Sequence, residues 1–448
     1  MPDDDPASRI GFAYTTKDGI LDLPPEITAQ IFVHCLPLDL NSPSLLTAPL
    51  LLGQICTHWR TIAWQTPDLW TALKVDSARI PITLVEAWLG RTGTLPLSLA
   101  IAIWQEDEWD YCKAVIAVFK RFSSTWRKIA LEIPWEAFEF LAAESPLDLP
   151  LLDSLAIWTE ELDELPGAAL PWRAFRDAHA LRKLSVIDTV NPNALELPWT
   201  QLTSFECHDS GGMDSHDFLT ILKHTPNLVE CDAALFYYGH NTRPLPDVPP
   251  LTSLTSLALQ MSDEEDMDTF SHITLPALQI LDLSRVLFSG VVERLRPFLS
   301  NPDCRIRELI IRINERPEVE DFMQLLEAQP SLEKFDFREG YLGLLIALCR
   351  RLCDGSAFLP RLSCLCASPC IYPVSEITEV FPVMLDALDD ALHARNMLSS
   401  DCFAKIQKCV IKDWTGSRTD DLDTIVERFR PRQRELIALG IDLVVGDE

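Results

Sequence analysis

The feature that most constrains the fold of this chain is a short leucine-based segment that recurs through most of its length. Four copies are clear, and each has a proline followed by apolar residues in the pattern P-x-L-x-x-L-x-L or a close variant. They span residues 149–157, 275–283, 329–337 and 359–367. Repeats of this kind bury their core against their neighbours in the chain, so the length of 448 residues does not fix a number of domains.

Weaker copies fall between the clear ones and before them. The central apolar residue of each copy serves as a marker: Ile129, Leu155, Leu184, Phe205, Cys231, Leu257, Leu281, Leu309, Phe335 and Leu365. Successive markers are between 21 residues (184 to 205) and 30 residues (335 to 365) apart. This period is close to the range of about 20 to 29 residues that is typical of leucine-rich repeats. Two further strands, near 73–75 and 97–101, are expected to begin the array.

The physics of the repeat predicts a strand followed by a helix. In L-x-L both apolar side chains point to the same side of a strand. Between the strands the apolar spacing becomes helical, as at residues 319, 322, 323 and 326 and again at 342, 345, 346 and 349. We therefore predict an α/β leucine-rich-repeat solenoid, a curved parallel sheet with outer helices. An ordinary α/β domain with leucine-rich strands is the alternative, and the regular spacing disfavours it.

A different pattern precedes the array. Residues 23–36 have prolines in the first turn and then apolar residues at helical spacing, which predicts a short amphipathic helix. After a loop over 37–49, a second apolar stripe follows at Leu52, Ile55, Trp59 and Ile62. Residues 66–70 then predict a turn or a new helix start.

Three ordered segments in this region resemble the F-box: L-P-x-E-I at 23–27, a variant of V-C-x-x-W-R at 55–60, and T-P-x-L-W at 66–70. The spacing is especially similar to the large F-box families of mushroom-forming fungi. The resemblance implies that this unit binds a Skp-type adaptor, and through it a cullin, in an SCF-type ubiquitin ligase whose repeats bind a protein substrate. The implied adaptor-binding residues are Leu23, Pro24, Glu26, Ile27, Ile31, Ile55, Cys56 and Trp59.

A second hypothesis remains open for the same segment. Its apolar residues could pack the helical unit against the first repeat, which would make the protein a leucine-rich-repeat interaction scaffold independent of ubiquitin. A solvent-facing apolar patch on the 23–36 helix would favour the adaptor site.

The full chain is predicted to have four parts. These are a flexible N-terminus (1–20), an F-box-like helical domain (21–72), the repeat array (73–372) and a C-terminal helical cap (373–448). The cap is expected to contain helices near 375–395, 401–410 and 427–443, which would cover the open edge of the last repeat.

Charge and composition exclude several classes of partner. The formal net charge of −29 disfavours nucleic acid and anionic membrane surfaces, because affinity for both comes mainly from Lys and Arg. The N-terminus is acidic and no run of 18 apolar residues occurs, so we expect an intracellular protein, cytoplasmic or nuclear. In that reducing setting the 13 cysteines are interpreted as small apolar packing residues.

Motifs for cofactor chemistry are missing from the sequence. It has no G-x-G-x-x-G, no G-x-x-x-x-G-K-[ST], no H-E-x-x-H and no C-x-x-C, so we predict a non-enzyme with no cofactor and no metal. The segment Cys207–Gly212 contains D-S-G-G, which resembles the nucleophile segment of trypsin-like proteases. Since a serine nucleophile needs a histidine base held by a buried acid, Ser210 is better interpreted as part of a turn.

Two other patterns are interpreted structurally. Cysteines four residues apart, at 349 and 353 and at 366 and 370, have no histidine nearby and favour packing over metal binding. The acidic run 263–266 is expected to begin a helix, where carboxylates interact with the positive end of the dipole.

Strand alternation also predicts the side chains that project from the open face of the sheet, opposite to the leucines. They are Glu206, His208, Asp232, Gln260, Asp282, Ser284, Arg312, Asp336 and Arg338. The mixed charges of Asp282, Arg312, Asp336 and Arg338 make these four the candidate substrate-binding residues. An ordinary solvated face is the alternative, and the proline-rich segment between 239 and 250 is a second location for the site.

Overall fold

The structure is a computed structural model of the chain. It describes residues 23–37, 40, 42–134, 137, 140–141, 147–158, 173–187, 192–208, 213–236, 243–313, 317–354, 358–370, 379–397, 404–411 and 420–445. The chain divides into two compact units, Met1–Ala137 and Phe138–Glu448.

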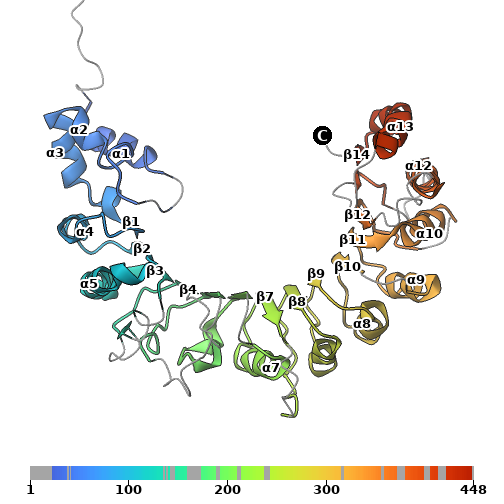
Figure 1. The fold of residues 1–448 in the computed structure, drawn as a ribbon, viewed down its shortest axis with the longest axis horizontal. Helices are drawn as coiled ribbons and strands as arrows, with labels where there is room; N and C mark the ends of the chain where they lie inside the picture. Colours follow the sequence, from blue (N-terminus) through green and yellow to red (C-terminus); the bar gives the residue numbers. More distant parts are fainter. Residues whose placement is uncertain are drawn as a thin grey trace, which may run out of the picture. The chain divides into compact units, whose positions relative to one another are not determined.

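The first unit begins with helices and continues as strand-helix repeats (Figure 1). Its elements are α1 (Pro25–His34), α2 (Leu52–Ile55), α3 (Thr57–Gln65), η1 (Pro67–Trp70), β1 (Ala72–Val75), α4 (Ile82–Leu89), β2 (Leu97–Ala102), η2 (Glu106–Glu108), α5 (Trp109–Lys120), η3 (Ser123–Thr125) and β3 (Trp126–Glu132). The three strands are parallel, and Leu73, Leu99 and Ile129 pair in one row. The two strands expected at the start of the array are therefore confirmed.

The second apolar stripe of the helical motif is not one helix. Cys56 has extended backbone angles (φ −157°, ψ 167°) and separates α2 from α3. Its Sγ accepts a hydrogen bond from the backbone N–H of Trp59 at 3.4 Å, so this residue caps α3. Arg60 Nε donates to the carbonyl of Gly53 at 2.6 Å and joins the two helices across the break.

Trp70 connects the helical motif to the first repeat. It is fully buried, and its indole N–H donates to the carbonyl of Ala63 at 2.9 Å. Its ring lies edge-on to Trp64 and to Trp88 of α4, with centroids 5.3 and 4.9 Å away. Trp88 in turn donates its indole N–H to the carbonyl of Trp70 at 2.9 Å. This tryptophan cluster joins α3 and η1 to α4 of the first repeat.

The second unit is a parallel sheet whose strands pair in chain order. The strands are β4 (Ser154–Trp158), β5 (Lys183–Ile187), β6 (Ser204–His208), β7 (Glu230–Leu235), β8 (Ser256–Met261), β9 (Ile280–Val286), β10 (Glu308–Arg312), β11 (Lys334–Tyr341), β12 (Cys364–Cys370), β13 (Lys408–Ile411) and β14 (Asp442–Val445). Between them lie η4 (Pro192–Ala194), η5 (Trp199–Gln201), α7 (Ser215–His224), η6 (Glu264–His272), α8 (Val291–Leu299), α9 (Val319–Glu327), α10 (Leu342–Cys353), α12 (Phe381–Met397) and α13 (Asp420–Ala438).

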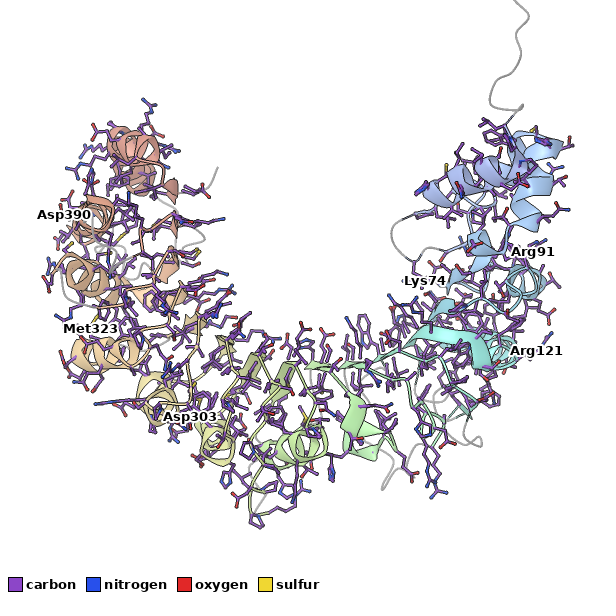
Figure 2. All side chains as sticks on the ribbon, turned by 180° about the vertical axis from the view of Figure 1, so that it is seen from behind. Lys74, Arg91, Arg121, Asp303, Met323 and Asp390 are labelled. Atoms are coloured by element: carbon purple, nitrogen blue, oxygen red, sulfur yellow. The ribbon has the colours of Figure 1, made fainter. Side chains whose placement is uncertain are left out.

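The helices of this unit cover one face of the sheet and leave the other open (Figure 1). In Figure 2 the labelled Met323 of α9 and Asp390 of α12 mark the helix side. Each strand lies between its sequence neighbours, so the unit is an α/β solenoid, as predicted, and not an ordinary α/β domain with crossed connections.

The repeat markers are confirmed residue by residue. Leu155, Leu184, Phe205, Cys231, Leu257, Leu281, Leu309, Phe335 and Leu365 pair in register from β4 to β12, and all are buried. The row continues through Cys409 of β13 and Leu443 of β14, two positions that the sequence pattern did not reveal.

The C-terminal segment differs from the predicted helical cap. The helix expected over 401–410 is wrong where the structure describes it, because residues 408–411 form β13. The helix expected over 427–443 is α13, which ends at Ala438 and is followed by β14. Each strand is four residues long and lacks the leucine-and-proline frame of the earlier repeats, so its pattern was too short to distinguish from a helical one.

A ladder of backbone hydrogen bonds joins successive repeats. From β4 to β12, the carbonyl just before the strand accepts two N–H groups from the residues that enter the next strand, at 2.7 to 3.2 Å. The accepting carbonyls belong to Asp153, Arg182, Thr203, Val229, Thr255, Gln279, Arg307, Glu333 and Ser363. The backbone supplies this ladder, so the array does not need a conserved polar side chain after L-x-L.

The helical stripes are confirmed with one exception. In α9 the residues Phe322, Met323 and Leu326 are buried, whereas Val319 at its start is 46% exposed. In α10 all four predicted stripe residues are buried, including Cys349. The acidic run also begins a helix as expected: Asp263 and Asp266 form a capping box at the start of η6.

We predict that Trp70→Ala destabilises the first unit by about 3–5 kcal/mol, because it removes a fully buried indole from the tryptophan cluster. Leu46→Ala is the control, since Leu46 is 83% exposed, and it should change stability by less than about 0.5 kcal/mol. Urea unfolding followed by tryptophan fluorescence measures both. Equal stability of the two variants would contradict the assignment of Trp70 to the core.

Candidate functional site

Helix α1 has one apolar face that packs inward and another that remains in solvent. Thr28 and Phe32 are buried, and the Phe32 ring meets the Trp59 ring edge-on at 4.9 Å between centroids. Ile27 and Ile31, four residues apart and hence on one side of the helix, are 44% and 38% exposed. The helix therefore presents a pair of isoleucines that its own unit does not cover.

The other residues implied by the F-box resemblance divide between two roles. Ile55 at the end of α2 is 54% exposed. Cys56 caps α3 and Trp59 packs on Phe32, so both hold the helices together. Leu23, Pro24 and Glu26 lie at the start of α1, where Leu23 is half-buried and the other two are exposed.

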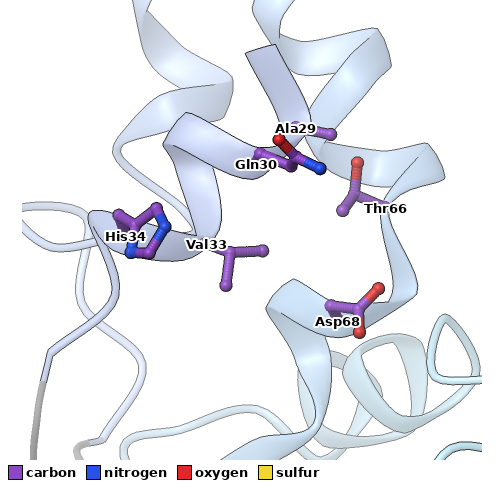
Figure 3. A pocket seen from close by; sticks show the side chains of 6 residues that line it. All are labelled: Ala29, Gln30, Val33, His34, Thr66 and Asp68. Atoms are coloured by element: carbon purple, nitrogen blue, oxygen red, sulfur yellow. The ribbon is translucent and has the colours of Figure 1, made fainter. Parts of the chain in front are cut away.

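A shallow pocket of about 410 Å³ lies beside α1 (Figure 3). It is lined by Ala29, Gln30, Val33 and His34 of the helix together with Thr66 and Asp68. Asp68 and His34, the titratable groups of this lining, come from opposite ends of the pocket in Figure 3.

The four candidate substrate-binding residues lie on β9, β10 and β11, and the structure gives each a partner. Arg338 Nη2 lies 3.2 Å from the Asp336 carboxylate on the same strand. Arg312 Nε donates to Glu339 at 2.7 Å, a partner that strand alternation did not single out. Asp282 Oδ1 accepts the backbone N–H of Ser284 at 2.8 Å. Arg312 and Arg338 are thus each paired with a nearby carboxylate.

A second charged group, here named the sheet-face cluster, consists of Glu206, His208, Asp232 and Arg285. His208 Nε2 lies 3.0 Å from Glu206 Oε1 and 3.5 Å from Asp232 Oδ2. Arg285 contacts Asp232 through Nη2, and its Nη1 lies 3.0 Å from His208 Nδ1. The cluster spans β6, β7 and β9 on the open face of the sheet.

Sequence alternation found three of these residues but missed Arg285. The pairing of β8 with β9 is irregular: Asp282 pairs with Ala258, but Arg285 pairs with Gln260. This bulge inserts an extra residue and turns the Arg285 side chain to the open face. Gln260, which was predicted to project there, is half-buried beside it.

The carboxylates and imidazole of this cluster lie close enough to hold a metal ion, since their ligand atoms fall within 4.8 Å of one another. Arg285 opposes that use. Because its Nη1 can only donate, His208 Nδ1 must accept, which places the proton of the neutral ring on Nε2. A metal ion bound at Nε2 would require the ring proton to move to Nδ1. There the N–H would point at the guanidinium of Arg285, which has no acceptor for it. The arrangement is therefore a charge-paired hydrogen-bond network.

Several sequence interpretations fall outside the described residues. The D-S-G-G segment at 209–212, including Ser210, is one of them, as are residues 237–242 at the start of the proline-rich insertion. Of the described cysteines, Cys349 is buried and Cys353 Sγ lies 3.3 Å from the Cys349 carbonyl, in keeping with packing.

Repeated parallel strands in register, with helices on one face, decide the fold. This is the fold of a leucine-rich-repeat protein. No family model and no curated protein matches the sequence. Among solved structures, the leucine-rich-repeat-containing protein LegL7 from Legionella pneumophila is similar at 15% identity, with a TM-score of 0.33. The match covers 61% of this chain and 97% of LegL7.

None of the described helices combines the length and the apolar character needed to cross a bilayer.

We predict that Arg285→Ala creates a zinc site in the sheet-face cluster. Without the guanidinium, His208 Nε2 and two carboxylates can all turn to the ion, as zinc coordination requires. Zinc affinity, measured by calorimetry on the full chain, should rise at least about tenfold, or about 1.4 kcal/mol. Combining Arg285→Ala with His208→Ala is the control and should abolish the gain. Unchanged zinc affinity in the single variant would contradict the role given to Arg285.

Proposed function

We propose that this protein is the substrate-recognition subunit of an SCF-type ubiquitin ligase. In this proposal the F-box-like helices bind a Skp-type adaptor, and through it a cullin, while the repeats bind a protein substrate. The broader role has firmer support, because leucine-rich-repeat solenoids serve as protein-interaction scaffolds. The ligase role rests on the sequence resemblance together with the exposure of particular motif residues.

The observation that carries the ligase role is the exposure of Ile27, Ile31 and Ile55 in the folded first unit. A motif whose apolar residues served only to pack against the first repeat would bury them. The packing is instead done by Phe32, Trp59 and Trp70. Exposed isoleucines within a motif that resembles the F-box support an adaptor-binding surface.

The open face of the sheet is the proposed substrate surface. Repeat solenoids bind partners on this extended face, where each strand contributes its outward side chains. Asp282, Arg312, Asp336 and Arg338 offer both signs of charge there, and Arg338 is exposed. A partner segment with its own mixed charges could exchange the local ion pairs for pairs across the interface.

We expect Ile27→Glu combined with Ile31→Glu to weaken binding of a Skp-type adaptor by at least about 100-fold, or about 2.7 kcal/mol. Two carboxylates would have to be desolvated in an apolar interface. Both side chains are partly exposed, so the thermal midpoint should stay close to that of the wild type. Direct binding to purified adaptor, measured by interferometry, tests the effect.

Ile437→Glu is the matched control, because Ile437 of α13 is 48% exposed in the second unit and lies outside the F-box-like motif. It should leave adaptor binding unchanged. If wild-type protein does not bind the adaptor at all, the ligase role is wrong, and the protein is a repeat scaffold independent of ubiquitin.

We expect charge reversal at Asp336 and Arg338 (Asp336→Arg with Arg338→Asp) to weaken capture of an identified substrate about tenfold or more, or at least about 1.4 kcal/mol. The swap keeps the pair and its net charge, so stability should change little. Adaptor binding is the internal control and should remain intact. Unchanged substrate capture would place the substrate site elsewhere, such as the proline-rich insertion.

A further inference from the structure

Near its start, strand β12 carries two cysteines, Cys364 and Cys366, that face the same way. Cys364 and Cys366 are two residues apart, so both side chains lie on the open face of the sheet, and both are half-buried. Their sulfur atoms are 3.9 Å apart, within reach of an S–H hydrogen bond. Leu365 between them is fully buried on the opposite face.

Lysines flank Cys364 on both neighbouring strands. Lys334 of β11 and Lys408 of β13 are its partners in register. Each lysine also pairs with a carboxylate on the strand on its other side. Lys334 contacts Glu308 of β10, and Lys408 Nζ lies 3.8 Å from Asp442 of β14. Cys366 has a different neighbour, because Asp336 of β11 lies beside it in the next row.

These surroundings make the two thiols unequal. The hydrogen bond from Cys366, aided by Lys334 and Lys408, lowers the pKa of Cys364 to about 7, although partial burial and Glu308 act in the opposite direction. The same hydrogen bond, together with burial and the Asp336 charge, raises the pKa of Cys366. Of the two thiols, Cys364 therefore loses its proton more readily and Cys366 keeps its proton beside it, which is the arrangement of an attacking and a resolving cysteine.

We propose that Cys364 and Cys366 form an oxidation-sensitive dithiol on the open face of the sheet, which hydrogen peroxide converts to an intramolecular disulfide. The Cys364 thiolate attacks one peroxide oxygen, so that an S–O bond forms, the O–O bond breaks and hydroxide leaves. The Cys366 sulfur then displaces the hydroxyl group from the Cys364 sulfenic acid. The S–S bond forms, the S–O bond breaks, and the thiol proton leaves with the hydroxyl as water.

Closing the bond requires β12 to bend locally. Residues two apart on a strand have Cα atoms about 6.6 Å apart and parallel Cα–Cβ directions, so their Cβ atoms lie farther apart than the roughly 3.5 to 4.5 Å found in disulfides. The disulfide is therefore strained, and strain makes the bond more reducible. The site is thus suited to reversible oxidation. It lies one strand from Asp336 and Arg338, so its oxidation state would alter the proposed substrate surface.

Alkylation kinetics test the thiolate. On the full chain under native conditions, iodoacetamide should modify Cys364 at pH 7 at least about fivefold faster than Cys353. A larger fraction of Cys364 is thiolate, which raises its rate, and a thiolate of lower pKa is a weaker nucleophile, which offsets part of that gain. Cys353 is the control because it too is half-buried, while burial and nearby aspartates raise its pKa. Mass spectrometry of the peptides gives each rate. An equal or slower rate for Cys364 would overturn the proposal.

Removing the flanking charges tests their role. The double variant Lys334→Met with Lys408→Met should shift the pH profile of Cys364 alkylation to higher pH, while the Cys353 profile should not move. A Cys364 profile that stays in place would refute the contribution of the lysines.

Mass spectrometry after peroxide treatment tests the disulfide. The tryptic peptide that begins at Leu362 should lose two hydrogen atoms, and a reductant should restore its mass. This peptide also contains Cys370, so Cys370→Ser is the control and should keep the loss. Cys364→Ser and Cys366→Ser should each abolish it. Persistence of the loss in either variant, or no loss in the wild type, would overturn the proposal. These readouts need neither adaptor nor substrate, so they are independent of the ligase role.

Discussion

The second unit depends on a pair of backbone hydrogen bonds that links each repeat to the next. The carbonyl before each strand accepts two N–H groups from the next repeat, from Asp153 along the array to Ser363. A buried backbone group without a partner costs free energy comparable to a lost hydrogen bond, so this ladder satisfies the points at which the chain enters the sheet. It also fixes the register of each strand against the one before it. Leucine side chains then fill the space between sheet and helices without having to define the alignment themselves.

Fixed register turns the open face into rows of side chains. In one row Lys334, Cys364 and Lys408 lie on adjacent strands, which surrounds a thiol with positive charge. In another, Glu206 and Asp232 lie on adjacent strands, where His208 and Arg285 join them. These groupings come from residues far apart in the sequence, and a shift of one residue in any strand would separate them.

The first unit shows how one motif can pack its helices together and still leave apolar side chains in solvent. Buried tryptophans join the helices to the first repeat, and Cys56 and Arg60 hold two short helices at a fixed break. With packing done by these groups, Ile27 and Ile31 can stay on the surface. A surface isoleucine pair on a rigid helix loses little conformational freedom on binding, which suits it to a protein interface.

The sequence by itself determined the repeat, the strand positions from β1 to β12 and the orientation of most outward side chains, because side-chain alternation and repeat period are local properties of the chain. It did not reveal β13 and β14. Each is only four residues long, and the two are identified as strands by their pairing in register with β12 and with each other. The adaptor and substrate residues stay predictions. Arg285 reached the open face through a bulge that depends on how β8 and β9 pair. The lowered pKa of Cys364 comes first from the hydrogen bond with Cys366 and then from lysines on the neighbouring strands, so only the tertiary structure decided it.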